Sequence, residues 1–218
     1  MSLALFDLDN TLIAGDSDHL WGDFLVAEGL VEPNKHKALN EHYYQQYQQG
    51  QLDIDEYLSF ALAPMAGMTP ETLSALQDKF LKKHVEPILL DAAFDLLQAH
   101  RVNGDTLIII TATNTLVTQP IADRLGVEHL IGCEAELKDG RYTGKPEGVP
   151  SFGEGKVQRI KTWCAVHQIL FEDAVFYSDS HNDLPLLRKV ARAIAVDPDD
   201  LLRVEAQQCG WEIISLRP

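Results

Sequence analysis

The feature that most constrains this sequence is an apolar run near its start that carries two acidic residues. The stretch LALFDLDNTL covers residues 3–12 and places Asp7 and Asp9 one residue apart. Alternate side chains of a strand point to the same face, so a strand from Leu3 would present both carboxylates on one side. Two neighbouring carboxylates repel each other unless a cation or a shared proton lies between them. The pattern therefore predicts a strand whose end carries a charged functional site.

Further short apolar runs have the character of strands that are covered on both faces. They are rich in branched residues and alternate with segments of helical periodicity. The predicted strands are 3–7, 106–111, 174–178 and 192–196, with 211–216 as a candidate fifth. The predicted helices lie within 89–102, 115–127, 156–168 and 182–190. This alternation predicts an α/β fold, a doubly wound parallel sheet of the Rossmann-like type.

Two segments interrupt the alternation. Residues 16–85 show helical patterns and no convincing strand, which predicts a helical cap inserted into a core made of residues 1–15 and 86–218. Residues 133–145 read as a hairpin that turns at Asp139-Gly140. Ligands of a doubly wound sheet bind beyond the carboxyl ends of its strands, so we expect the cap to act as a lid there.

The overall charge and the cysteines limit the classes of partner. The 218 residues include 33 acidic and 18 basic ones, a net charge of −15, which disfavours binding to nucleic acid. Three cysteines without a close pair predict reduced thiols and a cytoplasmic protein. No run approaches the ~20 apolar residues that span a bilayer, and the start leaves no room for a signal peptide. The sequence leaves a monomer and a homodimer both open.

Polar residues recur where predicted strands end or helices begin. Besides the first pair, these are Thr111, Lys156, Asp179 and Asp183. The carboxyl ends of parallel strands meet at one edge, so we expect these side chains to form a single site. Four aspartates facing one ammonium and one hydroxyl call for a hard divalent cation, and Mg²⁺ suits such oxygen ligands.

This ordered set resembles the four motifs of the haloacid dehalogenase superfamily. The matching residues are DLDNT (7–11), Thr111, Lys156 and DSHND (179–183). The long helical insertion after the first motif resembles the subclass that includes phosphoserine phosphatase. The resemblance covers nearly the whole chain and implies a Mg²⁺-dependent phosphatase that forms an aspartyl phosphate.

The resemblance also implies a role for each matching residue. Asp7 would be the nucleophile, and Asp9 the general acid and then the general base. The metal set would consist of Asp7, the Asp9 carbonyl and Asp179, with Asp183 in support. The phosphate and substrate set would consist of Thr111, Ala112, Lys156, Asn182 and Asp16.

Departures from the phosphoserine phosphatase pattern bear on the substrate. The cap contains no arginine to hold a substrate carboxylate, since the first arginine of the chain is Arg101. Asp16 lies nine residues after the nucleophile, where the family has an acidic residue that reaches the substrate amine. More acids and aromatic residues follow it, namely Asp18, Asp23, Glu28, Trp21, Tyr43, Tyr44 and Tyr47. Acids beside aromatic faces suit a cationic group, so we expect a phosphomonoester with an amine and no carboxylate.

Histidinol phosphate fits this description best, with phosphoethanolamine, phosphocholine and phosphoserine as alternatives. A phosphotransferase would use the same motifs and remains open. A non-catalytic phosphate-binding module is disfavoured because Asp7 and Asp9 are both present. Taken singly, the residues also have structural interpretations: Asp179 and Asp183 as helix caps, Lys156 as a solvated residue, and Trp21 as part of the cap's own core.

Overall fold

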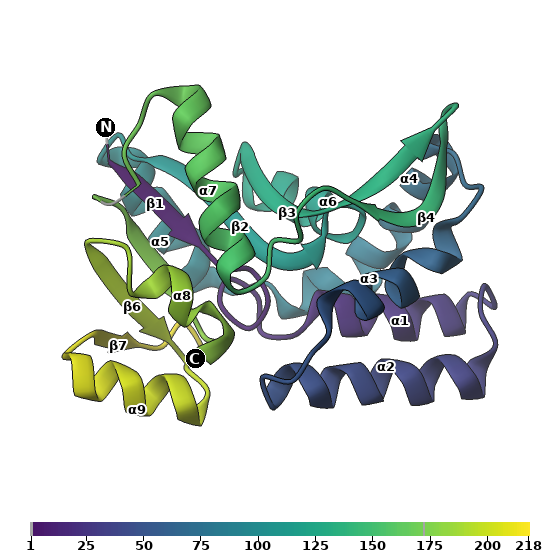
Figure 1. The fold of residues 1–218 in the computed structure, drawn as a ribbon, viewed down its shortest axis with the longest axis horizontal. Helices are drawn as coiled ribbons and strands as arrows, with labels where there is room; N and C mark the ends of the chain where they lie inside the picture. The colour runs from purple at the N-terminus through teal and green to yellow at the C-terminus, as the bar shows by residue number, and fades with distance from the viewer. Residues whose placement is uncertain (1, 172) are drawn as a thin grey trace.

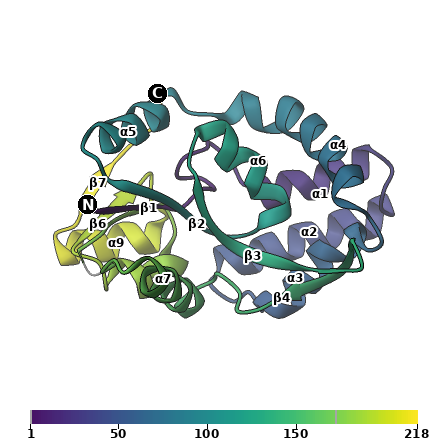
Figure 2. The same cartoon turned by 90° about the horizontal axis from the view of Figure 1, so that it is seen from above.

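The computed structural model describes residues 2–171 and 173–218, which form a seven-stranded sheet with helices on both faces (Figures 1 and 2). The strands are β1 (Leu3–Phe6), β2 (Thr106–Asn114), β3 (His129–Lys138), β4 (Arg141–Glu147), β5 (Val175–Ser178), β6 (Arg192–Val196) and β7 (Glu212–Ile214). Their order is β4-β3-β2-β1-β5-β6-β7, and every neighbouring pair is parallel except β3 and β4. The predicted doubly wound α/β fold is confirmed.

The two faces of the sheet bury separate apolar clusters. Helices α5 (Asp91–Val102) and α6 (Thr115–Leu125) cover one face, and α7 (Glu154–His167), α8 (Leu184–Leu187) and α9 (Asp200–Cys209) cover the other. In β1, Ala4 and Phe6 pack into the first cluster while Leu3 and Leu5 pack into the second. A strand buried on both sides needs apolar residues throughout, which explains the unbroken run at the start of the chain.

The segment between β1 and α5 is helical, as predicted. It comprises α1 (Ser17–Ala27), α2 (Pro33–Gln48), α3 (Ile54–Leu62) and α4 (Pro70–Phe80), with short turns η1 (Ala63–Met65), η2 (Leu81–Val85) and η3 (Glu86–Ile88). Figures 1 and 2 place these four helices together at one end of the molecule. Trp21, Phe24 and Phe80 pack there with ring centroids 5.0 to 5.6 Å apart. The division into a core and a separate cap domain remains a prediction.

The β3–β4 hairpin ties this helical segment to the sheet. It turns at Asp139-Gly140, as predicted, with positive φ at both residues. At its far end the backbone of Tyr142 exchanges hydrogen bonds with Gly67 and Met68 of the helical segment, at 2.8 and 3.0 Å. The hairpin therefore reaches over from the sheet to the helices, as Figure 1 shows.

β5 and β7 (Glu212–Ile214) are shorter than the predicted 174–178 and 211–216, and the boundaries of three further strands also differ from the prediction. β1 ends at Phe6 rather than at residue 7, and β2 continues beyond residue 111 to Asn114. β3 begins at His129 as a parallel partner of β2, before the predicted hairpin. β1 lies between β2 and β5, so the chain winds away from it in both directions. The crevice at its carboxyl end is the usual ligand site of such sheets.

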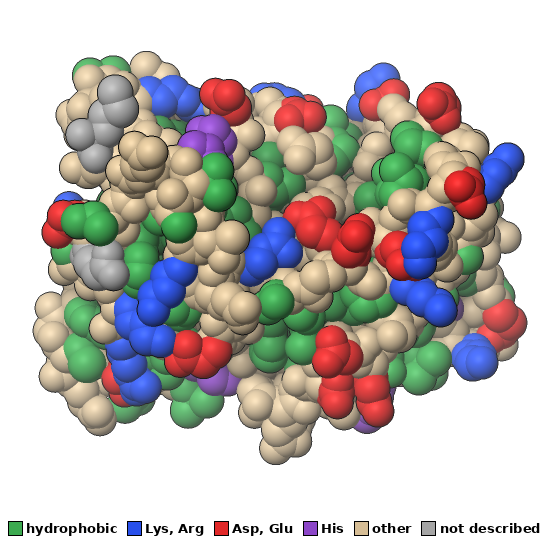
Figure 3. All heavy atoms as spheres, turned by 45° about the horizontal axis from the view of Figure 1, so that its top comes forward, with side chains coloured by type: hydrophobic (Ala, Val, Ile, Leu, Met, Phe, Trp, Pro, Cys, Tyr) green, Lys and Arg blue, Asp and Glu red, His purple; other side chains and the backbone are tan. Residues whose placement is uncertain are grey.

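Acidic and basic side chains are intermixed over the face drawn in Figure 3. None of the helices in residues 2–171 and 173–218 combines the length and the apolar character needed to cross a membrane.

Candidate active site

The two aspartates of the first motif lie in a tight turn after β1. The amide of Asp7 donates to the carbonyl of Tyr177 at 2.9 Å, which continues the pairing with β5 by one residue. The carbonyl of Leu8 accepts from the amides of Thr11 and Leu12, and Asn10 has a φ of 56°. The expected strand alternation therefore does not extend to Asp9. The turn nevertheless brings both carboxylates to the same pocket.

Lys156 is buried between two carboxylates of different motifs. It lies in the first turn of α7 and is only 2% exposed. Its Nζ is 2.8 Å from Oδ1 of Asp7, and 2.6 and 2.8 Å from the two oxygens of Asp183. The structure thus brings together residues 149 positions apart, and the alternative of a solvated lysine is wrong.

The loop after β5 supplies the remaining acids. Ser178 donates to Oδ2 of Asp183 at 2.7 Å, so Asp183 is held by a hydroxyl and an ammonium together. Thr11 donates to Oδ1 of Asp179 at 2.9 Å and accepts from the amide of Asp179 at 3.0 Å. Thr11 was not among the predicted site residues. Its place in the DLDNT motif, two residues after Asp9, is the signal that would have pointed to it.

Asp9 is held by three donors from two elements. The amide of Ser17 donates to Oδ1 at 2.6 Å, and the hydroxyl of Thr113 donates to Oδ2 at 2.8 Å. The Thr111 hydroxyl lies 3.5 Å from the same oxygen. Thr113 was missed because the strand was expected to end at residue 111. Burial, followed by the charge of Asp16, raises the pKa of Asp9 to about 6.

The site carries more negative charge than its side chains neutralise. Burial raises the pKa of Asp7 to about 7, although Lys156 acts in the opposite direction. Burial and then the charge of Asp7 raise the pKa of Asp179 well above its usual range. Burial lowers the pKa of Lys156, but Asp183 and Asp7 outweigh it and the net pKa is raised, so the ammonium stays charged. One cation facing several acids is the electrostatic setting of a cation or phosphate site.

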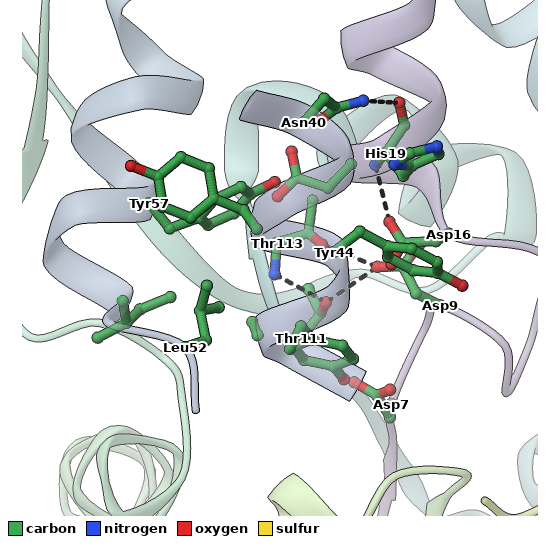
Figure 4. Close-up of a pocket in the computed structure, with 15 residues that line it drawn as sticks. Asp7, Asp9, Asp16, His19, Asn40, Tyr44, Leu52, Tyr57, Thr111 and Thr113 are labelled. Atoms are coloured by element: carbon green, nitrogen blue, oxygen red, sulfur yellow. Dashed lines mark hydrogen bonds between the residues drawn. The ribbon is translucent and has the colours of Figure 1, made fainter. Parts of the chain in front are cut away.

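A pocket opens beside Asp7 and Asp9 and runs under the helical segment. Its walls are formed by Asp7, Asp9, Asp16, Asp18, His19, Asn40, Tyr43, Tyr44, Tyr47, Leu52, Ile54, Tyr57, Thr111, Ala112 and Thr113. Figure 4 shows Asp7, Asp9 and Asp16 toward one side of the pocket and Leu52 and Tyr57 toward the other. Four of the walls' side chains are carboxyl groups, and none of the described residues that form them is a lysine or arginine.

The sequence identified only part of these walls. The expected acids and aromatic residues that do line the pocket are Asp16, Asp18, Tyr43, Tyr44 and Tyr47. Trp21 instead belongs to the apolar core, and Glu28 forms an ion pair with Lys79 at 2.9 Å. The pattern of the sequence did not single out Tyr57, His19 or Asn40.

Two predicted phosphate-binding residues have clear positions. Ala112 lines the pocket between the two threonines of β2. The side-chain amide of Asn182 donates to the carbonyl of Tyr47 at 3.0 Å and so joins the loop after β5 to the end of α2. In this arrangement Asn182 holds the helical segment against the sheet. A contact with phosphate stays a prediction for both residues.

Comparisons with known proteins agree with this arrangement. A family model described as haloacid dehalogenase-like hydrolase matches residues 4–188. The chain is 41% identical to a histidinol-phosphatase of Neisseria meningitidis serogroup C (strain 8013), over 99% of both chains. It is 32% identical to a phosphoserine phosphatase of Mycobacterium tuberculosis (strain ATCC 25618 / H37Rv), over 98% of this chain and 70% of that one.

Solved structures extend the comparison. A protein of unknown function from Bordetella pertussis Tohama I superposes with a TM-score of 0.93 at 42% identity, covering 99% of both chains. A phosphoserine phosphatase with an analogue of its phospho-aspartyl intermediate has a TM-score of 0.69 at 18% identity, covering 99% of this chain and 93% of that one, and shares the fold. The chain belongs to the haloacid dehalogenase-like hydrolase family. Within that family it is a phosphatase.

Proposed function

We propose that this phosphatase hydrolyses a small phosphomonoester that bears an amine, histidinol phosphate in particular. The observation that carries the proposal is a single pocket with two different ends. Asp7, which pairs with the buried Lys156, lines the pocket beside Asp9, and further acids and tyrosines line the remainder of it. The relative named histidinol-phosphatase, at 41% identity over the full chain, supports the same substrate.

The proposed reaction begins with Asp7. One of its carboxylate oxygens attacks phosphorus and forms an acyl phosphate while the bond to the ester oxygen breaks. Lys156 lies 2.8 Å from Asp7, where its ammonium would contact the phosphoryl oxygens as charge builds on them. The Thr111 hydroxyl and the Ala112 backbone complete the proposed phosphate contacts.

Asp9 handles the protons in this proposal. With a pKa of about 6, it can start protonated and give its proton to the departing alkoxide. The resulting carboxylate then takes a proton from the water that attacks the acyl phosphate, which releases inorganic phosphate and regenerates Asp7. The hydrogen bonds from Ser17 and Thr113 keep the carboxyl group aimed at the pocket during both steps.

The residues present fit a magnesium ion. No three carboxylate, imidazole or thiol groups of the described residues gather closely enough to hold a metal by themselves. Asp7 and Asp179 with the Asp9 carbonyl would supply two carboxylates and one carbonyl, and Mg²⁺ is commonly bound this way while keeping several waters. Burial, with a further contribution from neighbouring carboxylates, raises the pKa of Asp7 and of Asp179, and a bound cation would offset both effects. When bound, Mg²⁺ supplies positive charge that lets an anionic nucleophile approach a phosphate dianion.

Both carboxylate oxygens of Asp183 are already occupied by side-chain hydrogen-bond donors, which sets this residue apart from the proposed metal ligands. Its oxygens contact the Lys156 ammonium and the Ser178 hydroxyl. We propose that Asp183 positions Lys156, and any support for the metal passes through water.

The leaving-group end favours a cation over a carboxylate. Asp16 lines the same pocket as Asp9, and after burial its charge is the largest influence that raises the pKa of Asp9. An ammonium group beside Asp16 would relieve this repulsion, whereas the carboxylate of phosphoserine would add to it. We therefore place phosphoserine after histidinol phosphate and phosphoethanolamine among the candidate substrates.

A substrate panel tests the proposal. We expect phosphate release to require Mg²⁺, to cease with a chelator, and to favour histidinol phosphate over phosphoethanolamine, phosphocholine, phosphoserine and an aryl phosphate. The preference in kcat/KM over phosphoserine should be at least about 10²-fold, because phosphoserine places an uncompensated carboxylate among acids. A preference for phosphoserine would overturn the substrate while leaving the phosphatase in place.

A second prediction concerns the positioning of Asp9. Thr113→Val removes the hydroxyl that donates to its carboxylate, and we expect kcat to fall by about 10-fold with little change in KM. Thr113→Ser retains the donor and should keep kcat within about 3-fold of the wild type. Steady-state kinetics with histidinol phosphate measure both variants. An unchanged kcat in Thr113→Val would show that Ser17 and Thr111 hold Asp9 without it.

A phosphotransferase remains the alternative from another class. It would form the same intermediate and pass the phosphoryl group to an acceptor other than water. Product analysis with and without candidate alcohols separates the two activities. The cytoplasmic location stays a prediction. A monomer and a homodimer both stay open.

A further inference from the structure

Asp18 is a buried acid for which the proposed reaction has no use. It lies in the first turn of α1, is 7% exposed and lines the pocket. The Asn114 side chain donates to Oδ1 of Asp18 at 3.3 Å. The Asp18 carboxyl group also shares a hydrogen bond with the Tyr57 hydroxyl. These partners come from β2 and α3, so three elements converge on one carboxyl group.

None of the described residues that line the pocket with Asp18 is a lysine or arginine. Burial, then the charge of Asp16, raises the pKa of Asp18 to about 8. The nearby Oδ1 of Asn114 is buried without a hydrogen-bond partner. Burying a carboxyl group in a partly aromatic wall costs free energy unless something binds to it. A ligand with N–H donors or positive charge would supply what this end of the pocket lacks.

The acids of the pocket follow an order. The amide of Ser17, next to Asp16 in the chain, donates to Asp9, and Figure 4 shows Asp16 and Asp9 on the same side of the pocket. Asp18 contacts Asn114 and Tyr57, and Tyr57 lies toward the other side. The pocket presents a general acid, a first carboxylate and a second, more deeply buried carboxyl group in that sequence.

The leaving group of the proposed substrate has polar groups in the same order. Its ester oxygen comes first, an ammonium follows two carbons further on, and an imidazole ring ends the chain. With the ester oxygen at Asp9, the ammonium would reach Asp16 and the ring would extend toward Asp18. The Tyr43 and Tyr57 rings in the same wall offer aromatic faces to a flat cationic ring.

We infer that Asp18, with Tyr57, forms a second nitrogen-binding subsite that selects leaving groups carrying an N–H ring beyond their ammonium group. Asp18 is then a specificity-determining residue, and Asp16 serves every amine substrate. This inference rests on the proposed function and assigns the ammonium group to Asp16 and the ring to Asp18.

The test compares Asp18→Asn and Asp16→Asn on two substrates. Phosphoethanolamine carries only the ammonium, whereas histidinol phosphate carries the ring as well. We expect Asp18→Asn to lower kcat/KM for histidinol phosphate by at least about 10-fold, mainly through KM, and to change phosphoethanolamine by less than about 3-fold. Asp16→Asn should lower kcat/KM for both substrates.

Binding of the product separates recognition from chemistry. Calorimetry with histidinol should show at least about 10-fold weaker binding to Asp18→Asn than to the wild type. Tyr57→Phe keeps the ring, removes the hydroxyl and should act in the same direction if Asp18→Asn fails to fold. Asp55→Asn, an exposed aspartate of α3, is the matched control and should behave as wild type.

The outcomes distinguish the inference from the proposed function. A wild-type enzyme without preference for histidinol phosphate over phosphoethanolamine overturns both. A wild-type preference that persists in Asp18→Asn and Tyr57→Phe overturns the subsite alone. Equal losses on the two substrates also overturn it, because they would show a structural role for Asp18.

Discussion

Replacing Asp7 by asparagine should abolish turnover, with kcat reduced by at least about 10⁴-fold, as expected when a covalent nucleophile is removed. The amide of asparagine has nearly the same shape, but it cannot attack phosphorus to form a stable acyl phosphate. The side chain is 3% exposed and 2.8 Å from Lys156, so the substitution changes the chemistry at a fixed position. Phosphate release and the incorporation of labelled phosphate into denatured protein measure the two consequences together.

The fold of the variant should survive. Asp183 still pairs with Lys156 after the change, and a neutral amide removes the cost of ionising a carboxyl group whose pKa burial raises to about 7. We expect the melting temperature to stay within about 3 °C of the wild type, which corresponds to about 1 kcal/mol for a chain of this size. Asp78→Asn, on the exposed side of α4, is the matched control. Substantial turnover by Asp7→Asn would refute the assignment of the nucleophile.

Much of the sheet could be predicted because each strand is a local pattern. β1, β5 and β6 are short apolar runs between helical segments, and their boundaries were predicted to within one residue. The start of β3 was missed because His129 and Gly132 interrupt the apolar character of that run. A Cβ at Gly132 would meet the carbonyl of Thr113 at 2.9 Å, so the glycine allows β3 to pack against β2. The need for a glycine at this position follows only from the packing of β3 against β2, which the local sequence does not show.

The cluster of Asp7, Lys156 and Asp183 was predictable for a similar reason. Asp7, Lys156 and Asp183 each follow a strand or open a helix, and parallel strands bring such positions to one edge. The Thr113 contact was not predictable, because β2 has an irregular register between Ile110 and Asn114 that carries the strand past its apolar run. Residues 111 and 113 then share one face, which directs both hydroxyls to Asp9.

The leaving-group end depends on how helices pack, which sequence periodicity does not specify. Asp18 and Asn114 are 96 residues apart, and Tyr57 reaches the same carboxyl group from another helix. The sequence indicated acids and aromatic residues in this segment, but not which of them face the pocket. Trp21 and Asp18 lie within one turn of α1, yet only Asp18 lines the pocket. The residues that would select the substrate therefore depend mainly on tertiary contacts, whereas the proposed catalytic residues are recognisable from the sequence motifs.

Replacing Lys156 by methionine should have the largest effect on stability. Methionine keeps the length and apolar stem of the side chain but leaves Asp7 and Asp183 buried without their shared cation. Removing one partner of a buried ion pair costs about 3–5 kcal/mol, a large part of the stability of an ordinary domain. Turnover should fall by about 10³-fold in addition, since the ammonium would stabilise the phosphoryl oxygens. Lys189→Met, which removes an exposed partner of Glu154, should change stability by less than about 1 kcal/mol.

The pH dependence of the stability lost in Lys156→Met identifies the cause of that loss. The pKa of Asp7 is about 7 with Lys156 present, above its value of 3.8 in an unfolded chain, and loss of the ammonium raises it further. A carboxyl group with a raised folded-state pKa takes up a proton on folding, so stability increases as the pH falls below that pKa. The deficit of Lys156→Met should therefore be largest near pH 8 and shrink toward pH 5, as measured by urea unfolding of both proteins. An equal deficit at the two pH values would mean that the stem of Lys156, packed near the Phe176 ring, matters more than its charge.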